Sequence, residues 1–179
     1  AGYNTVVRYG NVLNSPMSII PIIHKIIKNS GKTLYLTNEQ MTRFIMTVDQ
    51  SVDLIDKALS YTMNSSYSAV VPKLKSMHVK DLLQIYADEY GCEVQTIGSN
   101  STEKFHEKMI REFEDCVHGG YIRPLYEGDN PAEVYLTGPY LKTETPENRG
   151  MFQSNNPDLL VSKEELREIL VALDLLEIK

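Results

Sequence analysis

The sequence predicts an α/β fold, because candidate strands and helices alternate along most of the chain. Short runs of β-branched and aromatic residues are followed by segments in which apolar residues recur at helical spacing. Two expected helix starts carry Thr or Ser followed three residues later by Gln or Glu, a pattern that satisfies the first free backbone N–H groups of a helix. The 179 residues are enough for one compact domain.

The N-terminal part predicts a strand followed by a helix. The run Thr5–Tyr9 is β-branched and aromatic, and Gly10 ends it. A helix begins after Ser18, its N-cap, and ends at Gly31. Its buried face is expected to hold Ile19, Ile22, Ile23, Ile26 and Ile27.

Alternation continues through the middle of the chain. Leu34–Leu36, Ser68–Val71 and Glu93–Ile97 are short strand candidates. Thr47 and Gln50 form a capping box at the start of a second helix. The inward-facing residues of this helix are expected to be Val52, Ile55 and Leu59.

Three further segments complete the expected secondary structure. A third helix spans about 77–90 and ends at Gly91, and a fourth is expected from Phe105 to Phe113. Residues 117–160 show no sustained period and are interpreted as loop with short strands. Ser162 and Glu165 form the capping box of a final helix at about 162–174. Residues 126–179 are interpreted as a loop-rich extension of residues 1–125, a division that rests on the family resemblance described below.

Composition excludes several classes of function. The net charge is −6, and no run of five like charges occurs, so a nucleic-acid surface is not expected. Cys92 and Cys116 have neither metal-knuckle spacing nor the density of a disulfide scaffold, which favours a reducing, cytoplasmic setting. We find no apolar run long enough to span a bilayer and no signal-peptide pattern, so no membrane partner is expected.

Motifs for redox, hydrolytic and metal chemistry are absent from the sequence. The ten glycines contain no pair at the spacing of a dinucleotide-binding fingerprint, and no tyrosine has a lysine four positions later. The four histidines lack the spacing of a zinc site. We therefore assign no catalytic and no metal-binding residue, and we expect the chain alone to be inactive as an enzyme.

Several short motifs follow one another in the sequence at a recognisable order and spacing. They are Val7–Val12, Ser18–Pro21, Met41–Phe44, Val71–Lys73, Ser76–Met77, Asp81–Leu82, Glu103–Glu107 and Ser154–Asn156. Together these motifs resemble the UDP-N-acetylglucosamine 4,6-dehydratase family of polysaccharide biosynthesis, whose members are extended short-chain dehydrogenases. The similarity covers about residues 5–125 and resumes near the final helix.

The resemblance implies a two-lobed lyase that acts on a UDP-sugar with NADP. Only its C-terminal part would be present: the last Rossmann strands and a small α/β substrate-binding lobe. The N-terminal NADP-binding region would be absent, and would act as a partner in cis or in trans. A homo-oligomer is also implied. The alternative is a non-catalytic, degenerate module that binds nucleotide sugars or serves assembly.

Matching positions in the family motifs imply site residues. Tyr9, Gly10 and Asn11 would lie beside the nicotinamide, and Asn11 would also bond to the substrate diphosphate. Arg43 would bind a diphosphate oxyanion through its planar fork, although an ion pair with a surface carboxylate is the alternative. Glu103 would accept from the ribose hydroxyls, or simply stabilise a helix start. The remaining substrate-side residues would be Val12, Met41, Thr42, Met77 and Asn100.

Two stretches depart from the family pattern. Asn14-Ser15-Pro16-Met17-Ser18 stands where the family commonly has Gly-Ser-Arg-Gly-Ser, and Asn100 replaces an arginine that faces the diphosphate. Each lost charge-assisted contact costs about 1.5–3 kcal/mol, so weaker UDP binding or a different ligand is expected.

Overall fold

The structure, a computed structural model, describes residues 4–62, 69–98, 103–111, 114–138 and 152–178. Its elements in chain order are β1 (Val6–Val7), β2 (Asn11–Val12), α1 (Ile19–Lys28), β3 (Thr33–Leu36), β4 (Thr42–Met46), α2 (Val48–Thr62), β5 (Ala69–Pro72), β6 (Ser76–His78), α3 (Val79–Tyr90), β7 (Glu93–Thr96), β8 (Cys116–Pro124), β9 (Pro131–Thr137) and α4 (Lys163–Ala172). The expected α/β class is confirmed.

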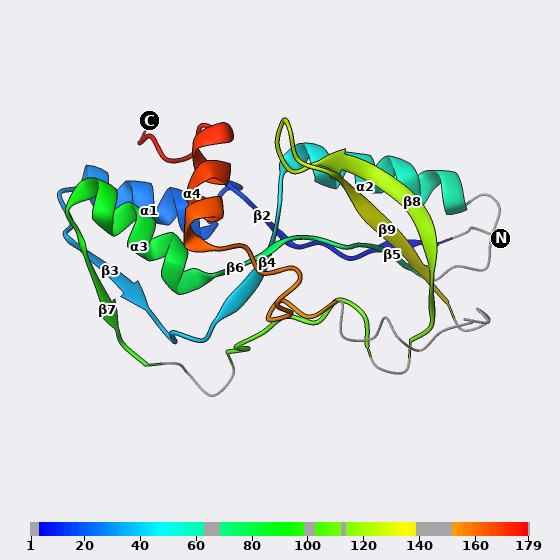
Figure 1. Cartoon of the computed structure of the whole chain (residues 1–179), viewed down its shortest axis with the longest axis horizontal. Coiled ribbons are helices and arrows are strands. Elements are labelled where there is room, and N and C mark those ends of the chain that lie inside the picture. Colours follow the sequence, from blue (N-terminus) through cyan, green and yellow to red (C-terminus); the bar gives the residue numbers. More distant parts are fainter. Residues whose placement is uncertain (1–3, 63–68, 99–102, 112–113, 139–151, 179) are drawn as a thin grey trace.

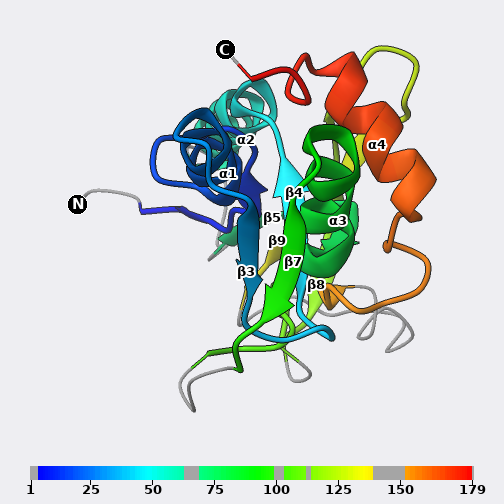
Figure 2. The same cartoon turned by 90° about the vertical axis from the view of Figure 1, so that its left-hand side faces the viewer.

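Three small sheets organise the chain (Figure 1). Strands β1, β5, β9 and β8 form the largest sheet in that order, β2, β4 and β6 form the second, and β3 pairs with β7. Helix α2 lies against the four-stranded sheet, whereas α1 and α3 lie beside the β3–β7 pair and α4 packs against α3 (Figures 1 and 2). The two ends of the molecule are joined through β2, β4 and β6.

The expected first strand, Thr5–Tyr9, is reduced to β1, and a second short strand that was not expected, β2, follows Gly10 in a different sheet. Val6 and Val7 pair in parallel with β5, and Asn11 and Val12 pair in parallel with β4. Gly10 lies between them, and a Cβ there would come within 2.6 Å of a methyl of Leu74. Only glycine lets the chain pass this close to its neighbour, because any side chain would clash.

Local helix signals in the sequence are confirmed. The Gln50 N–H donates to the Thr47 hydroxyl, and the Thr47 N–H donates to the Gln50 side chain, each at 3.1 Å. Ser162 accepts from the Glu165 N–H at the start of α4. Gly91 ends α3 in a left-handed conformation, with φ of 66°. Helix α1 instead ends through Ser30, which has a φ of 61°, ahead of Gly31.

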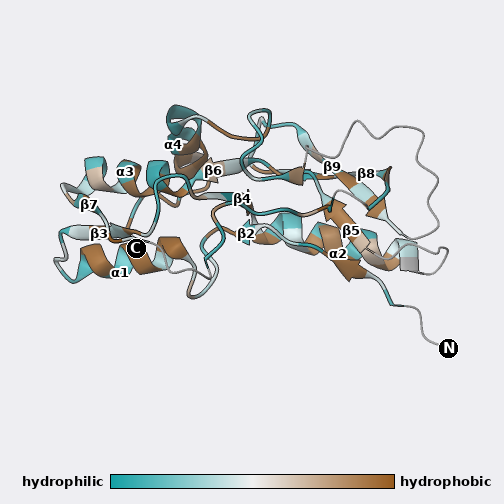
Figure 3. Ribbon diagram, turned by 90° about the horizontal axis from the view of Figure 1, so that it is seen from below, coloured by the Kyte–Doolittle hydropathy of each residue, from teal (hydrophilic) through white to brown (hydrophobic). Residues whose placement is uncertain are grey.

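The expected buried faces of the first two helices were partly wrong. Residues Val52, Ile55 and Leu59 of α2 are 43–61% exposed, while Leu54 and Ala58 are buried against the sheet. In α1, Ile22 is half-exposed and Ile20 is buried in its place. Both helices have apolar residues on more than one side (Figure 3), so periodicity alone could not select the packed face.

Residues expected to be loop or helix in the second half adopt other structures. The long hairpin β8–β9 occupies much of the expected loop 117–160, and β9 joins β5 in the main sheet. Residues 105–111 of the expected fourth helix are not helical, and the remaining two positions of that helix, 112–113, lie outside the described residues. Their backbone groups pair instead with the 152–154 segment, since the Met109 N–H donates to Phe152 and the Ser154 N–H to Glu107.

Met17 holds a strained backbone conformation in the turn before α1. Its φ is 63° and its side chain is 91% exposed, so no packing compensates for the strain. We expect Met17→Gly to raise the free energy of unfolding by about 0.5–1 kcal/mol, a gain reduced by the extra freedom of glycine in the unfolded chain. Thermal unfolding measures this, with Met17→Ala as the control that keeps the strain. A lower melting temperature for Met17→Gly contradicts the prediction.

Candidate functional site

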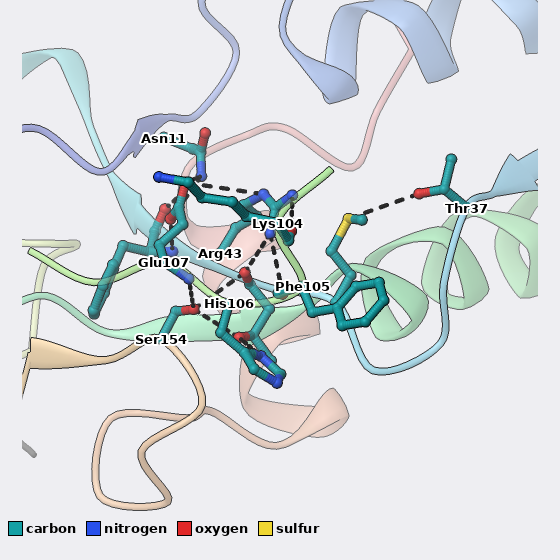
Figure 4. Close-up of polar contacts among 11 residues, drawn as sticks. Asn11, Thr37, Arg43, Lys104, Phe105, His106, Glu107 and Ser154 are labelled. Atoms are coloured by element: carbon teal, nitrogen blue, oxygen red, sulfur yellow. Dashed lines mark hydrogen bonds and ion pairs between the residues drawn. The ribbon is translucent and has the colours of Figure 1, made fainter. Parts of the chain in front are cut away.

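The candidate site lies where the paired strands β2 and β4 meet the 103–107 segment (Figure 4). Tyr9 is 42% exposed, and Gly10 separates it from Asn11 in the sequence. The Asn11 amide nitrogen donates to the carbonyl of Phe44 at 3.2 Å and faces both carboxylate oxygens of Glu107 at 3.3 Å. Val12 is half-buried and packs against the adjoining hydrophobic cluster.

Arg43 extends from β4 across the 103–107 segment. One terminal nitrogen donates to the carbonyls of Thr42 and Phe105, at 2.8 and 3.2 Å, and the other donates to the carbonyl of Lys104 at 2.9 Å. Its Nε lies 3.9 Å from the Glu107 carboxylate. Arg43 therefore holds this segment on β4. Its Nε also faces a carboxylate, which is the kind of partner that the alternative to ligand binding named.

Glu107 completes a cluster of donors around one carboxylate. Its Oε2 accepts from the Phe44 N–H at 2.9 Å, beside the Asn11 amide and the Arg43 Nε. The side chain is about one-third exposed, so the cluster opens to solvent. A backbone N–H, an amide and a guanidinium that converge in this way suit an oxyanion.

A buried hydroxyl network supports the segment from below. The Ser154 hydroxyl accepts from the Glu107 N–H at 2.8 Å and lies 2.6 Å from the Thr42 hydroxyl. Thr42 also lies 2.9 Å from Nδ1 of His106. Both hydroxyl groups belong to buried residues, so these bonds fix the position of the 106–107 backbone.

Arg8 anchors the strand that leads into the site. Its guanidinium makes a two-point contact with Glu114, at 2.6 and 2.8 Å, and also donates to the Met109 carbonyl. The hydrogen bonds from Arg8 hold the pKa of the Glu114 carboxyl below its ordinary value and raise the pKa of the guanidinium. These contacts tie Met109 and Glu114 to the residue that follows β1.

The structure does not bring all expected site residues together. Asn11 and Arg43 meet at the cluster, whereas the Thr42 side chain is fully buried in the hydroxyl network beneath it. Met41 and Met77 are buried in the main hydrophobic core, away from solvent. Glu103 is exposed at the start of the described 103–111 segment. Asn100 lies outside the described residues.

Sequence reasoning missed the roles of three residues, Glu107, His106 and Ser154. All three lie in motifs that were singled out, but no local pattern shows that residues 106–107 and 154 share one network with Thr42.

The fold is a mixed α/β domain that corresponds to about half of a larger protein of known structure. It aligns with Pen from Bacillus thuringiensis at a TM-score of 0.72 and 23% identity, over 96% of this chain and 50% of that one. A family profile described as polysaccharide biosynthesis protein matches residues 3–122. The chain belongs to this polysaccharide biosynthesis protein family.

Its relatives include enzymes with two different activities. A UDP-N-acetylglucosamine 4,6-dehydratase (inverting) of Campylobacter jejuni is 28% identical over 92% of this chain and 50% of its own length. A UDP-glucose 4-epimerase of Rickettsia prowazekii is 32% identical, over 94% and 49%. An uncharacterized membrane protein of Methanocaldococcus jannaschii is 31% identical, over 93% and 48%. The chain spans about half the length of these relatives.

The last of these relatives is named as a membrane protein. Among the helices in the described part of this chain, none combines the length and the apolarity needed to cross a bilayer.

Proposed function

We propose that this chain supplies the nucleotide-sugar-binding part of a UDP-sugar 4,6-dehydratase that acts in polysaccharide biosynthesis. The observation that carries the proposal is the convergence of the Asn11 amide, the Arg43 guanidinium and the Phe44 N–H on one partly exposed anion. Donors of these kinds suit the oxygens of a diphosphate. An epimerase on a related sugar would use the same groups.

The chain's own residues would bind and orient the nucleotide. Asn11 and Arg43 would contact the diphosphate, and the exposed Glu103 would accept from the ribose hydroxyls. Met41 and Met77 are buried, so in this conformation they would shape the core behind the site and not contact the base.

The residues present do not fit the pyrophosphate of NADP. The turn after β2 carries no glycine, and its left-handed positions are held by Asn14 and Met17, the places where the family commonly has glycine. Close approach of backbone to a pyrophosphate requires glycine in such a turn. NADP would therefore be held mainly by another lobe, with only Tyr9–Asn11 beside it, and this chain by itself would not carry out the redox steps.

Two exposed features support docking of such a lobe, in cis or in trans. Strand β1 pairs only with β5 among the described strands, which leaves its other edge open for a further strand. Helix α2 presents a second apolar stripe, made of Val48, Val52, Ile55 and Leu59.

The α2 stripe lies on the same side as that open edge. The flank of α2 that faces β8 carries Asp53 and Lys57, which bond to Arg123 and to the Tyr121 carbonyl. The stripe is turned away from β8, toward the β1 side of the sheet. An added strand and helix would cover both features, and a homo-oligomer could cover the stripe alone.

The non-catalytic module stays a second candidate because of Arg43. Three of its bonds go to carbonyls of its own chain, so part of its donor capacity serves to hold the fold. A degenerate module would keep this role after losing the ligand.

Calorimetric titration with UDP-N-acetylglucosamine tests the proposal. Wild type should bind, and Arg43→Ala should bind about 10–100-fold more weakly, because it loses a charge-assisted contact. Arg43→Lys keeps the charge but not the fork, and should fall between them. Arg167→Ala, which removes an exposed guanidinium on α4, is the matched control and should bind as wild type does.

Circular dichroism of each variant separates loss of the site from loss of the fold. A folded Arg43→Ala protein that binds as tightly as wild type would contradict the proposed role. Absence of binding by folded wild type would instead favour the assembly module.

A further inference from the structure

The Asn11 amide has no hydrogen left for a ligand while Glu107 holds its present position. An amide carries two N–H hydrogens. One is directed to the Phe44 carbonyl at 3.2 Å, and the carboxylate of Glu107 lies 3.3 Å from the same nitrogen through both of its oxygens. A new acceptor can bond to Asn11 only if one of these acceptors moves.

The same holds in part for Arg43. A guanidinium has five N–H hydrogens, and three of them are directed to the carbonyls of Thr42, Phe105 and Lys104. Two remain, one of them on Nε, which faces Glu107 at 3.9 Å. The carboxylate also offsets the positive charge of the guanidinium, so an approaching anion meets a weakened field.

Among the neighbours of these donors, Glu107 is the one able to move aside. The Phe44 and Thr42 carbonyls are part of β4, and the Phe105 carbonyl also accepts from the Thr42 backbone N–H. The Glu107 side chain is partly exposed, and only its own rotation is needed to release Asn11.

We propose that the Glu107 carboxylate is a built-in competitor that occupies the diphosphate position of this site and sets its affinity for nucleotide diphosphates. This inference rests on the proposed function, since it assigns the same donors to a diphosphate. A neutral nucleoside would not compete with Glu107, because it brings no anion to these donors. Glu107 would therefore weaken the binding of UDP selectively, without changing the binding of uridine.

The test compares the binding of UDP and of uridine to wild type, Glu107→Gln and Glu168→Gln. Gln keeps an oxygen that can accept from the Phe44 N–H but carries no charge. Glu107→Gln is expected to bind UDP on the order of three- to tenfold more tightly, from the removal of one nearby like charge, with the affinity for uridine unchanged. Glu168→Gln removes an exposed acid of α4 and should leave both affinities unchanged.

Two results would overturn the inference, and they differ from failure of the proposed function. If Glu107→Gln binds UDP no more tightly than wild type does, Glu107 does not compete with the diphosphate. Equal gains for UDP and uridine would show that the effect is not electrostatic. If neither protein binds UDP or uridine, the proposed function fails, and the inference fails with it.

Discussion

Phe152→Ala is expected to lower the free energy of unfolding by about 3–5 kcal/mol, the usual cost of removing a buried phenyl ring. Phe152 is 1% exposed and packs edge-to-face on Tyr135, with ring centroids 5.0 Å apart. Its loss would open a cavity between the β8–β9 hairpin and the 103–111 segment. A domain of this size should then melt roughly 6–20 °C lower.

Phe152→Leu is the matched control for this cavity. Leucine refills part of the space but loses the ring contact with Tyr135, so its cost should be clearly smaller. Chemical denaturation of both variants gives the two free energies. If Phe152→Ala lies within about 1 kcal/mol of wild type, the second hydrophobic cluster does not depend on this ring.

Ser154→Ala is expected to have the next largest effect, about 2–4 kcal/mol, although it removes a single oxygen atom. The Ser154 hydroxyl bonds to the Glu107 N–H, the Thr42 hydroxyl and the Thr42 carbonyl, at 2.8, 2.6 and 3.1 Å. Alanine would leave these partly or wholly buried groups without that partner. Because the 106–107 backbone would lose its support, affinity for UDP should fall as well.

A double-mutant cycle with Thr42→Val measures how far this network acts as a unit. Once Thr42 has lost its hydroxyl, deletion of the Ser154 hydroxyl leaves one fewer polar group without a hydrogen-bond partner. The double variant should therefore cost less than the two single variants together. Strictly additive costs would show that the 2.6 Å contact between the two hydroxyls contributes nothing to stability.

Features set by neighbouring residues could be predicted from the sequence. The Thr47–Gln50 capping box forms both of its bonds, and Gly91 ends α3 as expected. These signals need only a few adjacent residues, and so they do not depend on where the rest of the chain packs.

Features set by distant residues could not be predicted. Gly119, Gly120 and Pro124 interrupt the alternation expected of a strand, yet β8 accommodates them through two register shifts opposite β9. The packed face of α2 is chosen by the sheet it meets, since Leu54 and Val52 are equally apolar and only Leu54 is buried.

Some residues of the candidate site could likewise be predicted from the sequence, and others could not. Motif similarity implied that Asn11 and Arg43 share one site, and in the structure both lie beside the Glu107 carboxylate, although their ligand contacts stay predictions. Glu107 and Ser154 were missed because their roles depend on contacts made 96 residues from Asn11 and 112 residues from Thr42.

The link between Thr42 and Ser154 has a consequence for how the protein is made. Translation proceeds at roughly 5–20 residues per second, so a ribosome needs about 6–22 s to add the 112 residues that separate these partners. During that time β4 has emerged, but the hydroxyl that supports the site has not. The site can therefore assemble only after Ser154 has been added to the chain, and until then the nascent chain exposes apolar surface that it later buries.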